Sequence, residues 1–201
     1  MTDVLFNVQS VPFTLLLIVV WAIVVALFDR RNARRERVQA VSIVETIGVL
    51  VAAIAGSLFA PRDEGLAVGL AIAGIGIAAY GDIRHRFMWE EISVSTCFAV
   101  LAARALSGTA GAALYGMLLM AALALLAYFV GQYFGKEMGF GDVLPVATVG
   151  AALGFVLAPM AMFLACVLFV LVAVALRKRL DAALPFGPAI AGAVLIGSLL
   201  R

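Results

Sequence analysis

The sequence predicts an all-α membrane protein, a polytopic bundle of about eight transmembrane helices with its amino terminus outside. The first observation is composition, because 65% of the 201 residues are hydrophobic and only 13% are charged. Soluble domains contain about 45–50% apolar and about 25% charged residues. The apolar residues also form long stretches, and the basic residues cluster in alternate connections. These features exclude a soluble enzyme, a disordered chain and a disulfide scaffold.

Eight apolar stretches are candidate spans, since a helix needs about 20 residues to cross a bilayer. They are Val11–Phe28, Val41–Ala60, Leu66–Tyr80, Ile92–Leu106, Ala110–Tyr133, Val143–Leu157, Met160–Leu176 and Phe186–Leu200. The run from Val143 to Leu176 would be about 50 Å long as one helix, against a hydrocarbon core of about 30 Å. Gly154 and Pro159 provide a break, so this run is counted as two spans.

The distribution of basic residues predicts the orientation, because they stay on the cytoplasmic side. Met1–Asp3 carries no basic side chain, whereas five arginines follow the first span, which is therefore not a cleaved signal peptide. The connections assigned to the inside hold Arg30, Arg31, Arg34, Arg35, Arg37, Arg84, Arg86, Lys136, Arg177, Lys178 and Arg179. The outside ends hold only Arg62, Arg104 and Arg201. This asymmetry favours eight crossings over seven or nine.

No cofactor, metal or nucleic acid is expected. The two cysteines and the single histidine are too few and too scattered for a zinc site. No phosphate-binding G-x-x-x-x-G-K-[ST] motif occurs, and the net charge of +2 is too small to indicate nucleic acid. Glycine pairs at helical spacing, Gly65 with Gly69 and Gly150 with Gly154, are interpreted as helix-packing contacts.

The acidic residues are the candidates for chemistry. Glu45, about one turn inside the second span, is expected to reach the inner surface or to pair with an arginine. Asp82 closes the third span and Asp142 opens the sixth, so the topology places both at the cytoplasmic side. Gly139 and Gly141 are expected to allow a tight turn and close approach, with Asp142 as a helix N-cap.

Two aspartates that meet at one site suggest acid–base hydrolysis, because one carboxyl keeps a proton while the other activates water. The alternative is that Asp82 is a connection charge and Asp142 only a cap. A helix amino terminus favours negative charge and a carboxyl terminus disfavours it, which suggests Asp142 as the ionised base and Asp82 as the acid. The short spans also predict a thinned or water-filled mouth around them.

Three motifs carry a resemblance to a known family. Gly139-Phe140-Gly141-Asp142 resembles the G-x-G-D signature of membrane-embedded aspartyl proteases. Asp82-Ile83-Arg84-His85-Arg86 resembles the D-x-R-x-R segment of type IV prepilin peptidases, and Pro185-Phe186-Gly187-Pro188 resembles the P-F-G-P of their last helix. The resemblance covers residues 66–201, a six-helix protease core, and leaves residues 1–65 as two additional helices with a basic cytoplasmic loop.

The resemblance implies an endopeptidase of the inner membrane that removes short, basic leader peptides from prepilin-like proteins on the cytoplasmic side. Asp82 and Asp142 would be its catalytic pair, with Gly139, Gly141, Pro185, Gly187 and Pro188 as supporting motif residues. The cysteine-rich loop of methylating relatives is missing, so no methyltransferase activity is expected. The expected partners are a prepilin or pseudopilin substrate, the lipid bilayer and a pilus or secretion machinery.

Candidate substrate contacts lie on the cytoplasmic side with the two aspartates. The arginines among them could position the substrate, and the glutamates could attract a basic leader. These candidates are Arg84, Arg86, Glu90, Glu91 and Glu137. The chain departs from the family at Leu144, where lysine is usual, and at Trp89 and Glu90, which replace proline and asparagine or aspartate.

Two other functions stay open from the sequence. A small proton-coupled transporter would use Glu45, Asp82 and Asp142, although no internal repeat or mid-membrane helix break supports it. A catalytically inactive partner of a secretion or pilus machine is the other alternative.

Overall fold

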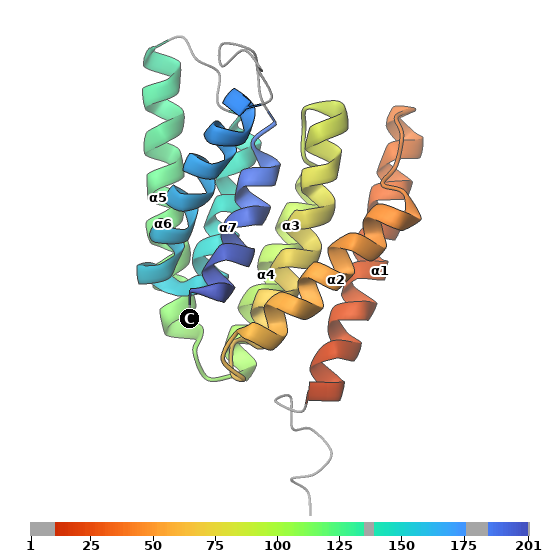
Figure 1. The fold of residues 1–201 in the computed structure, drawn as a ribbon, viewed down its shortest axis with the longest axis vertical. Coiled ribbons are helices and arrows are strands. Elements are labelled where there is room, and N and C mark those ends of the chain that lie inside the picture. The colour runs from red at the N-terminus through yellow and green to blue at the C-terminus, as the bar shows by residue number, and fades with distance from the viewer. Residues whose placement is uncertain (1–10, 135–138, 176–184, 201) are drawn as a thin grey trace, which may run out of the picture.

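A computed structural model describes residues 11–134, 139–175 and 185–200, and every regular element in these ranges is helical (Figure 1). The elements are α1 (Val11–Glu36), α2 (Ile43–Phe59), α3 (Gly65–His85), α4 (Glu90–Leu106), α5 (Ala110–Tyr133), the 3-10 helix η1 (Phe140–Asp142), α6 (Val143–Ala175) and α7 (Gly187–Leu199). The predicted all-α class is therefore confirmed.

Four of the described helices are long and apolar enough to cross a membrane, namely α1, α3, α5 and α6. The helices α2 and α7 are shorter and also apolar. Large apolar side chains such as Phe98, Phe129 and Phe163 lie exposed on the outside of the bundle, as contact with lipid requires. Length and surface together define a membrane protein.

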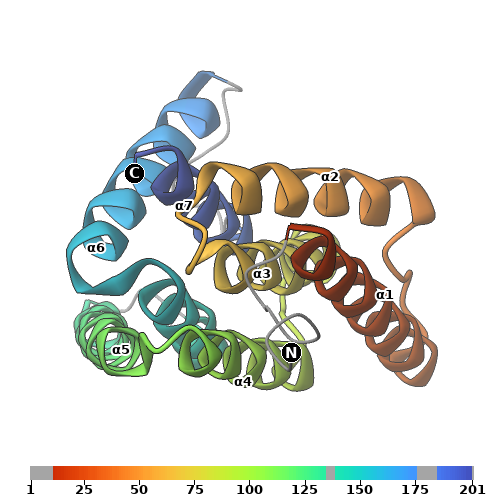
Figure 2. The ribbon, with the colours of Figure 1, turned by 90° about the horizontal axis from the view of Figure 1, so that it is seen from below.

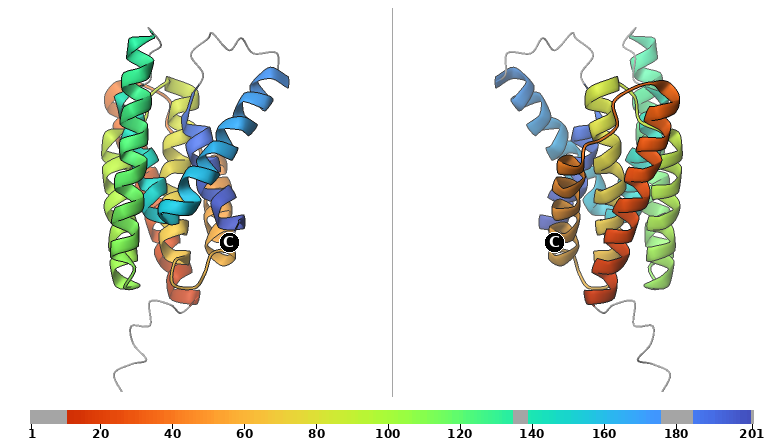
Figure 3. Two further views of the ribbon diagram at one scale, coloured as in Figure 1. Left: turned by 90° about the vertical axis from the view of Figure 1, so that its left-hand side faces the viewer. Right: turned by 90° about the vertical axis from the view of Figure 1, so that its right-hand side faces the viewer.

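The predicted break between the sixth and seventh spans is confirmed at Gly154. This residue has φ 78° and ψ 177°, which no helix accommodates, so α6 consists of two halves that meet at a sharp bend. The second half leaves the bend at a steep angle to the first, as the left view of Figure 3 shows. Glycine is suited to this position because a positive φ costs it no steric penalty.

The helix α3 lies in the middle of the bundle, with α1, α2, α4 and α7 around it (Figure 2). Small residues on α3 permit this close packing. A Cβ atom at Gly69 would collide with Ile18 of α1, one at Gly74 with Thr96 of α4, and one at Gly76 would lie 2.9 Å from Val49 of α2. The packing role expected for Gly69 is thus confirmed.

Gly150 has the corresponding role between α5 and α6. A Cβ atom there would collide with the backbone of Gly116, so the two helices cross almost backbone to backbone. Its expected partner Gly154 shares this contact, because a Cβ atom at Gly116 would lie 2.9 Å from the Cα atom of Gly154, and Gly154 also forms the bend. This close crossing brings the end of α5 beside η1, and Tyr128 meets Phe140 edge to face at 5.7 Å between ring centroids.

Two helices run further than their apolar residues indicate. The helix α1 continues from the expected end at Phe28 to Glu36, and α3 continues from Tyr80 to His85. Arginine is a good helix former, so these polar extensions do not interrupt the helices. Asp82 therefore lies on the last turn of α3, as expected for a residue that closes the third span, and not in a connection as in the alternative interpretation.

The amino terminus of α2 is capped, directly after the segment that joins α2 to α1. Ser42 and Glu45 form a capping box at the start of α2, and the Glu45 carboxylate also forms an ion pair with Arg84 at 2.6 Å. The predicted pairing of Glu45 with an arginine is confirmed. The ion pair joins the start of α2 to the last turn of α3, and the carboxyl end of α3 is at the top in Figure 1.

Candidate active site

Asp82 lies between α3, which carries it, and α7, at the end of the bundle where α3 ends and α7 begins. Its side chain is buried, at 7% exposure, and its Oδ2 atom accepts a hydrogen bond of 2.7 Å from the backbone N–H of Gly187. Gly187 is the first residue of α7, so the Asp82 carboxylate lies at a helix amino terminus. A backbone donor at such an end favours the charged form of a carboxylate.

Gly187 is required by the close approach of α7 to α3. A Cβ atom at this position would lie 2.9 Å from the Cα atom of Ala79 and 3.1 Å from both the Cβ and Oδ2 atoms of Asp82. Any side chain would push the start of α7 away and break the hydrogen bond to Asp82. The motif role expected for Gly187 therefore has a direct steric explanation.

Asp142 is the last residue of η1 and directly precedes α6. Its side chain is half-buried, and its backbone N–H donates to the carbonyl of Gly139 at 3.1 Å. The chain turns tightly here, as expected, in the 3-10 helix η1 that follows Gly139, but neither Gly139 nor Gly141 has a positive φ. A Cβ atom at Gly141 would meet nothing within 4 Å, and one at Gly139 would only touch Asp142.

Asp82 and Asp142 line one cavity of about 770 Å³. The turn after α3, the end of α5, η1 and the segment before α7 form its walls. The lining residues are Asp82, Arg86, Phe87, Met88, Glu90, Tyr128, Gln132, Gly139, Phe140, Gly141, Asp142, Pro185 and Phe186. The structure thus brings together two carboxyl groups that are far apart in the sequence.

The other candidate residues divide into two groups. Arg86, Glu90 and Pro185 line the cavity, as expected for substrate contact or support. Arg84 does not, because its guanidinium group binds Glu45 and the carbonyl of Ala40. Glu91 also lies outside the lining and accepts a long hydrogen bond of 3.4 Å from Asn32.

The remaining candidates lie elsewhere or are not described. Pro188 borders a separate apolar groove of about 280 Å³ between α2, α3 and α7. Glu137 lies outside the described residues. Among the described ranges there is no group of three or more His, Cys, Asp or Glu residues arranged to hold a metal.

Sequence reasoning missed most of the uncharged wall of the cavity. Phe140 and Phe186 stand inside the quoted motifs, and Phe87 and Met88 directly follow Arg86, so their place in the sequence was an available signal. Tyr128 and Gln132 stand one helical turn apart on α5, in an otherwise apolar segment. Two polar residues on one face of an apolar helix are typical of a helix that borders a polar site.

This arrangement has the parts needed for hydrolysis of a peptide bond. An open cavity admits water at the end of the bundle, and two carboxyl groups face it from different helices. Aromatic and apolar side chains beside them provide a surface for a peptide. The fold and the site together describe a helical protein with several helices long and apolar enough to cross a membrane, and with two aspartates that line one cavity.

Comparison with known families agrees with this description. Residues 69–174 match the model of the type IV leader peptidase family, which is just over half of the chain and includes both aspartates. The chain belongs to this family. No curated protein and no solved structure matches it. The helices α1 and α2 and the Pro185–Pro188 segment lie outside the matched residues.

Proposed function

We propose that this protein is a membrane-embedded aspartyl endopeptidase that cleaves the leader peptides of type IV prepilin-like proteins. The observation that carries the proposal is the shared cavity of Asp82 and Asp142. Family membership supplies the reaction class, a leader peptidase. The paired carboxyl groups supply the means, since hydrolysis by such a pair needs no metal or cofactor.

In this mechanism one aspartate is ionised and the other protonated. The hydrogen bond from Gly187 favours charged Asp82, so Asp82 removes a proton from water as its oxygen attacks the scissile carbonyl. Asp142 donates its proton to the leaving amide nitrogen. This reverses the assignment from the sequence, which considered only the carboxyl end of α3 and not the amino end of α7.

The proposed topology has eight crossings of the inner membrane, with the two halves of α6 counted separately and the amino terminus outside. The bend at Gly154 and the basic residues at the cavity end of the bundle support it. The cavity then faces the cytoplasm, where a basic leader would emerge from the membrane surface. A thiol introduced beside Arg34 should react with an impermeant reagent only in inside-out vesicles.

Charge and shape suggest how the substrate binds. Glu90 and the ionised Asp82 outnumber the single cation Arg86 among the described lining residues, so the cavity attracts a basic leader. Tyr128, Phe140 and Phe186 offer an aromatic surface for an apolar side chain next to the cleavage site. The substrate would be a prepilin or pseudopilin of a pilus or secretion machine. Methyltransferase activity is not part of the proposal.

The departures from the family motifs leave the cavity intact. Within the described residues, Trp89 and Leu144 are absent from its lining, whereas Glu90, the third departure, lines it and keeps an acidic group there. Pro145 lies in the first turn of α6, where proline is tolerated. These observations support an active enzyme over an inactive partner.

The test is cleavage of a candidate prepilin in membranes that contain wild-type protein, Asp82→Asn or Asp142→Asn. We expect cleavage by wild type and a loss of about a thousandfold or more in either variant, as in sites whose residues act as a unit. The matched control is Asp63→Asn, an exposed aspartate just before α3 at the opposite end of the bundle, which should leave cleavage unchanged.

Persistent cleavage in both variants would contradict the mechanism. A wild-type protein that cleaves no prepilin but takes up protons in vesicles would favour the transporter alternative.

A further inference from the structure

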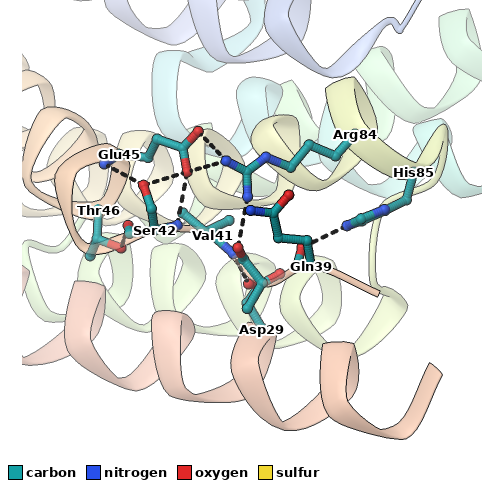
Figure 4. A network of polar contacts seen from close by, with 9 residues as sticks. Asp29, Gln39, Val41, Ser42, Glu45, Thr46, Arg84 and His85 are labelled. Carbon is teal, nitrogen blue, oxygen red and sulfur yellow. Dashed lines mark hydrogen bonds and ion pairs between the residues drawn. The ribbon is translucent and has the colours of Figure 1, made fainter. Parts of the chain in front are cut away.

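A network of polar contacts joins the amino-terminal hairpin to the turn between α3 and α4. The hairpin is α1, α2 and the segment 37–42 between them, and the cavity turn is Arg86–Trp89. Figure 4 shows Asp29, Gln39, Val41, Glu45, Arg84 and His85 within this network. The contacts reach both ends of the cavity turn.

The end of α3 is held from one side. Arg84 donates from Nη2 to both oxygens of Glu45, at 2.6 and 2.8 Å, and from Nη1 to the carbonyl of Ala40 at 2.7 Å. The Nε2 atom of His85 lies 2.8 Å from the carbonyl oxygen of Gln39. Two successive side chains of α3 therefore bind the hairpin segment.

The start of α4 is held through a buried aspartate. Asp29 of α1 is 1% exposed, and its Oδ1 accepts a hydrogen bond of 2.9 Å from the indole N–H of Trp89. Its Oδ2 accepts a second bond of 2.7 Å from the backbone N–H of Val41. One carboxylate thus connects α1, the start of α2 and the residue that precedes α4.

The residues between these two anchors form a wall of the cavity. Arg86, Phe87 and Met88 line it, as does Glu90 directly after Trp89. Arg86 has a left-handed conformation with φ 64°, which is uncommon for a residue other than glycine and persists only where the surroundings enforce it. The ring of Phe87 also packs edge to face on Trp89, at 4.7 Å between centroids.

The hairpin itself does not reach the cavity. In the described ranges no residue of α1 or α2 lines it, and Asp82 is held separately by Gly187 of α7. The contact of Asp29 with Trp89 therefore acts on the turn, while Asp82 has a hydrogen bond of its own from α7. The hairpin also precedes residue 69, where the family match begins.

We infer that the amino-terminal hairpin positions the substrate-facing turn of the cavity, with Asp29 acting through Trp89 as a positioning residue. This inference rests on the proposed function, because it assigns the turn to substrate binding. It also explains the tryptophan at position 89. The indole supplies a donor that connects the turn to the hairpin, whereas proline has no side-chain donor.

The test uses Asp29→Asn, Trp89→Phe and the double variant, with a leader peptide that includes the following apolar segment as substrate. Asparagine keeps the shape of Asp29 but cannot accept both hydrogen bonds, and phenylalanine keeps an aromatic ring without the N–H. We expect each single variant to raise KM about tenfold, with kcat within about twofold. The double variant should raise KM little more than either single change, because both remove one interaction.

The control for general destabilisation is Glu64→Gln, which disturbs the ion pair of Glu64 with Arg104 at the other end of α3. It should leave KM unchanged. The structural readout is the NMR resonance of the Trp89 indole N–H. It is assigned with the variant Trp21→Phe, which removes the other indole of the chain. It should be protected from solvent exchange in wild type and lose that protection in Asp29→Asn.

Each result supports or contradicts the inference. A rise in KM confined to the Asp29 and Trp89 variants supports it. Unchanged KM in both, a fall in kcat alone, or an equal effect of Glu64→Gln would overturn it while leaving the peptidase proposal intact. If wild type cleaves no leader peptide, the proposed function fails, and the indole resonance alone decides whether Asp29 holds Trp89.

Discussion

The two ends of the helix bundle place charged residues in opposite settings. At the closed end, the Arg104 side chain is 2% exposed and forms an ion pair of 2.6 Å with Glu64. At the cavity end, Asp82 and Asp142 face an open space of about 770 Å³. Arg104 and Glu64 bind each other, whereas Asp82 and Asp142 line the cavity that we propose binds the substrate. The comparison separates stability from function along the same helices.

Outside the aspartate pair, a glycine substitution at the cavity end should have the largest effect on cleavage. Gly187→Ala places a Cβ atom against the backbone of Ala79 and against Asp82, so α7 must move and its hydrogen bond to Asp82 is lost. We expect cleavage to fall about a hundredfold or more, as when one donor of a preorganised site is removed. The measurement is kcat/KM on a leader peptide.

Gly192→Ala is the matched control on the same helix. A Cβ atom there meets nothing within 4 Å, and alanine has the higher helix propensity. Equal losses of activity in the two variants would show that α7 does not position Asp82.

The pH dependence of cleavage should show the next largest effect. If the pair needs one ionised and one protonated carboxyl, the rate falls at low pH as the ionised partner gains a proton. It falls again at higher pH as the shared proton is lost. Each limb should change the rate about tenfold per pH unit. The two apparent pKa values of this profile describe the coupled aspartate pair and not either residue alone. A profile without an acidic limb would contradict the shared proton.

The wall residue Gln132 should have a smaller effect. Gln132→Ala removes a polar group from the cavity lining, and we expect KM to rise about threefold with kcat unchanged. Tyr133→Phe is the control. Tyr133 directly follows Gln132, but its side chain is 84% exposed and lies outside the cavity lining. A change of equal size in both variants would place the substrate elsewhere on α5.

The closed end should affect stability without affecting cleavage. Arg104→Met leaves the Glu64 carboxylate without its cation in a largely buried position, which costs about 3 kcal/mol of folding free energy. We expect a lower melting temperature in detergent and unchanged kcat/KM at a temperature where the variant is folded. Lost cleavage with unchanged stability would refute the division between the two ends.

Most of the fold follows from the apolar pattern. The expected limits of the fifth span, Ala110–Tyr133, are those of α5, and the bend at Gly154 follows from a run too long for one crossing. The ends of α1 and α3 do not follow, because arginine and aspartate continue a helix beyond the apolar stretch. Apolar length marks the part of a helix that meets lipid, not the whole helix.

The site was predictable only in part. Alternating topology places Asp82 and Asp142 at the same end, and the motifs single them out from the other acids. The sequence predicted that Glu45 pairs with an arginine but not that the partner is Arg84, because this depends on how α2 and α3 are rotated about their axes. The same applies to Tyr128 and Gln132, whose direction is set by the crossing of α5 and α6.

The most direct test of the central claim is whether residues 82 and 142 share one water-accessible site on the cytoplasmic side. Asp82→Cys and Asp142→Cys would be combined in a chain whose Cys97 and Cys166 are replaced by alanine. The chain would then be treated in inside-out vesicles with a short, impermeant bifunctional thiol reagent and analysed by mass spectrometry. The account predicts one intramolecular cross-link between the two positions. Thiols that react only singly, or only from the opposite side of the membrane, would contradict it.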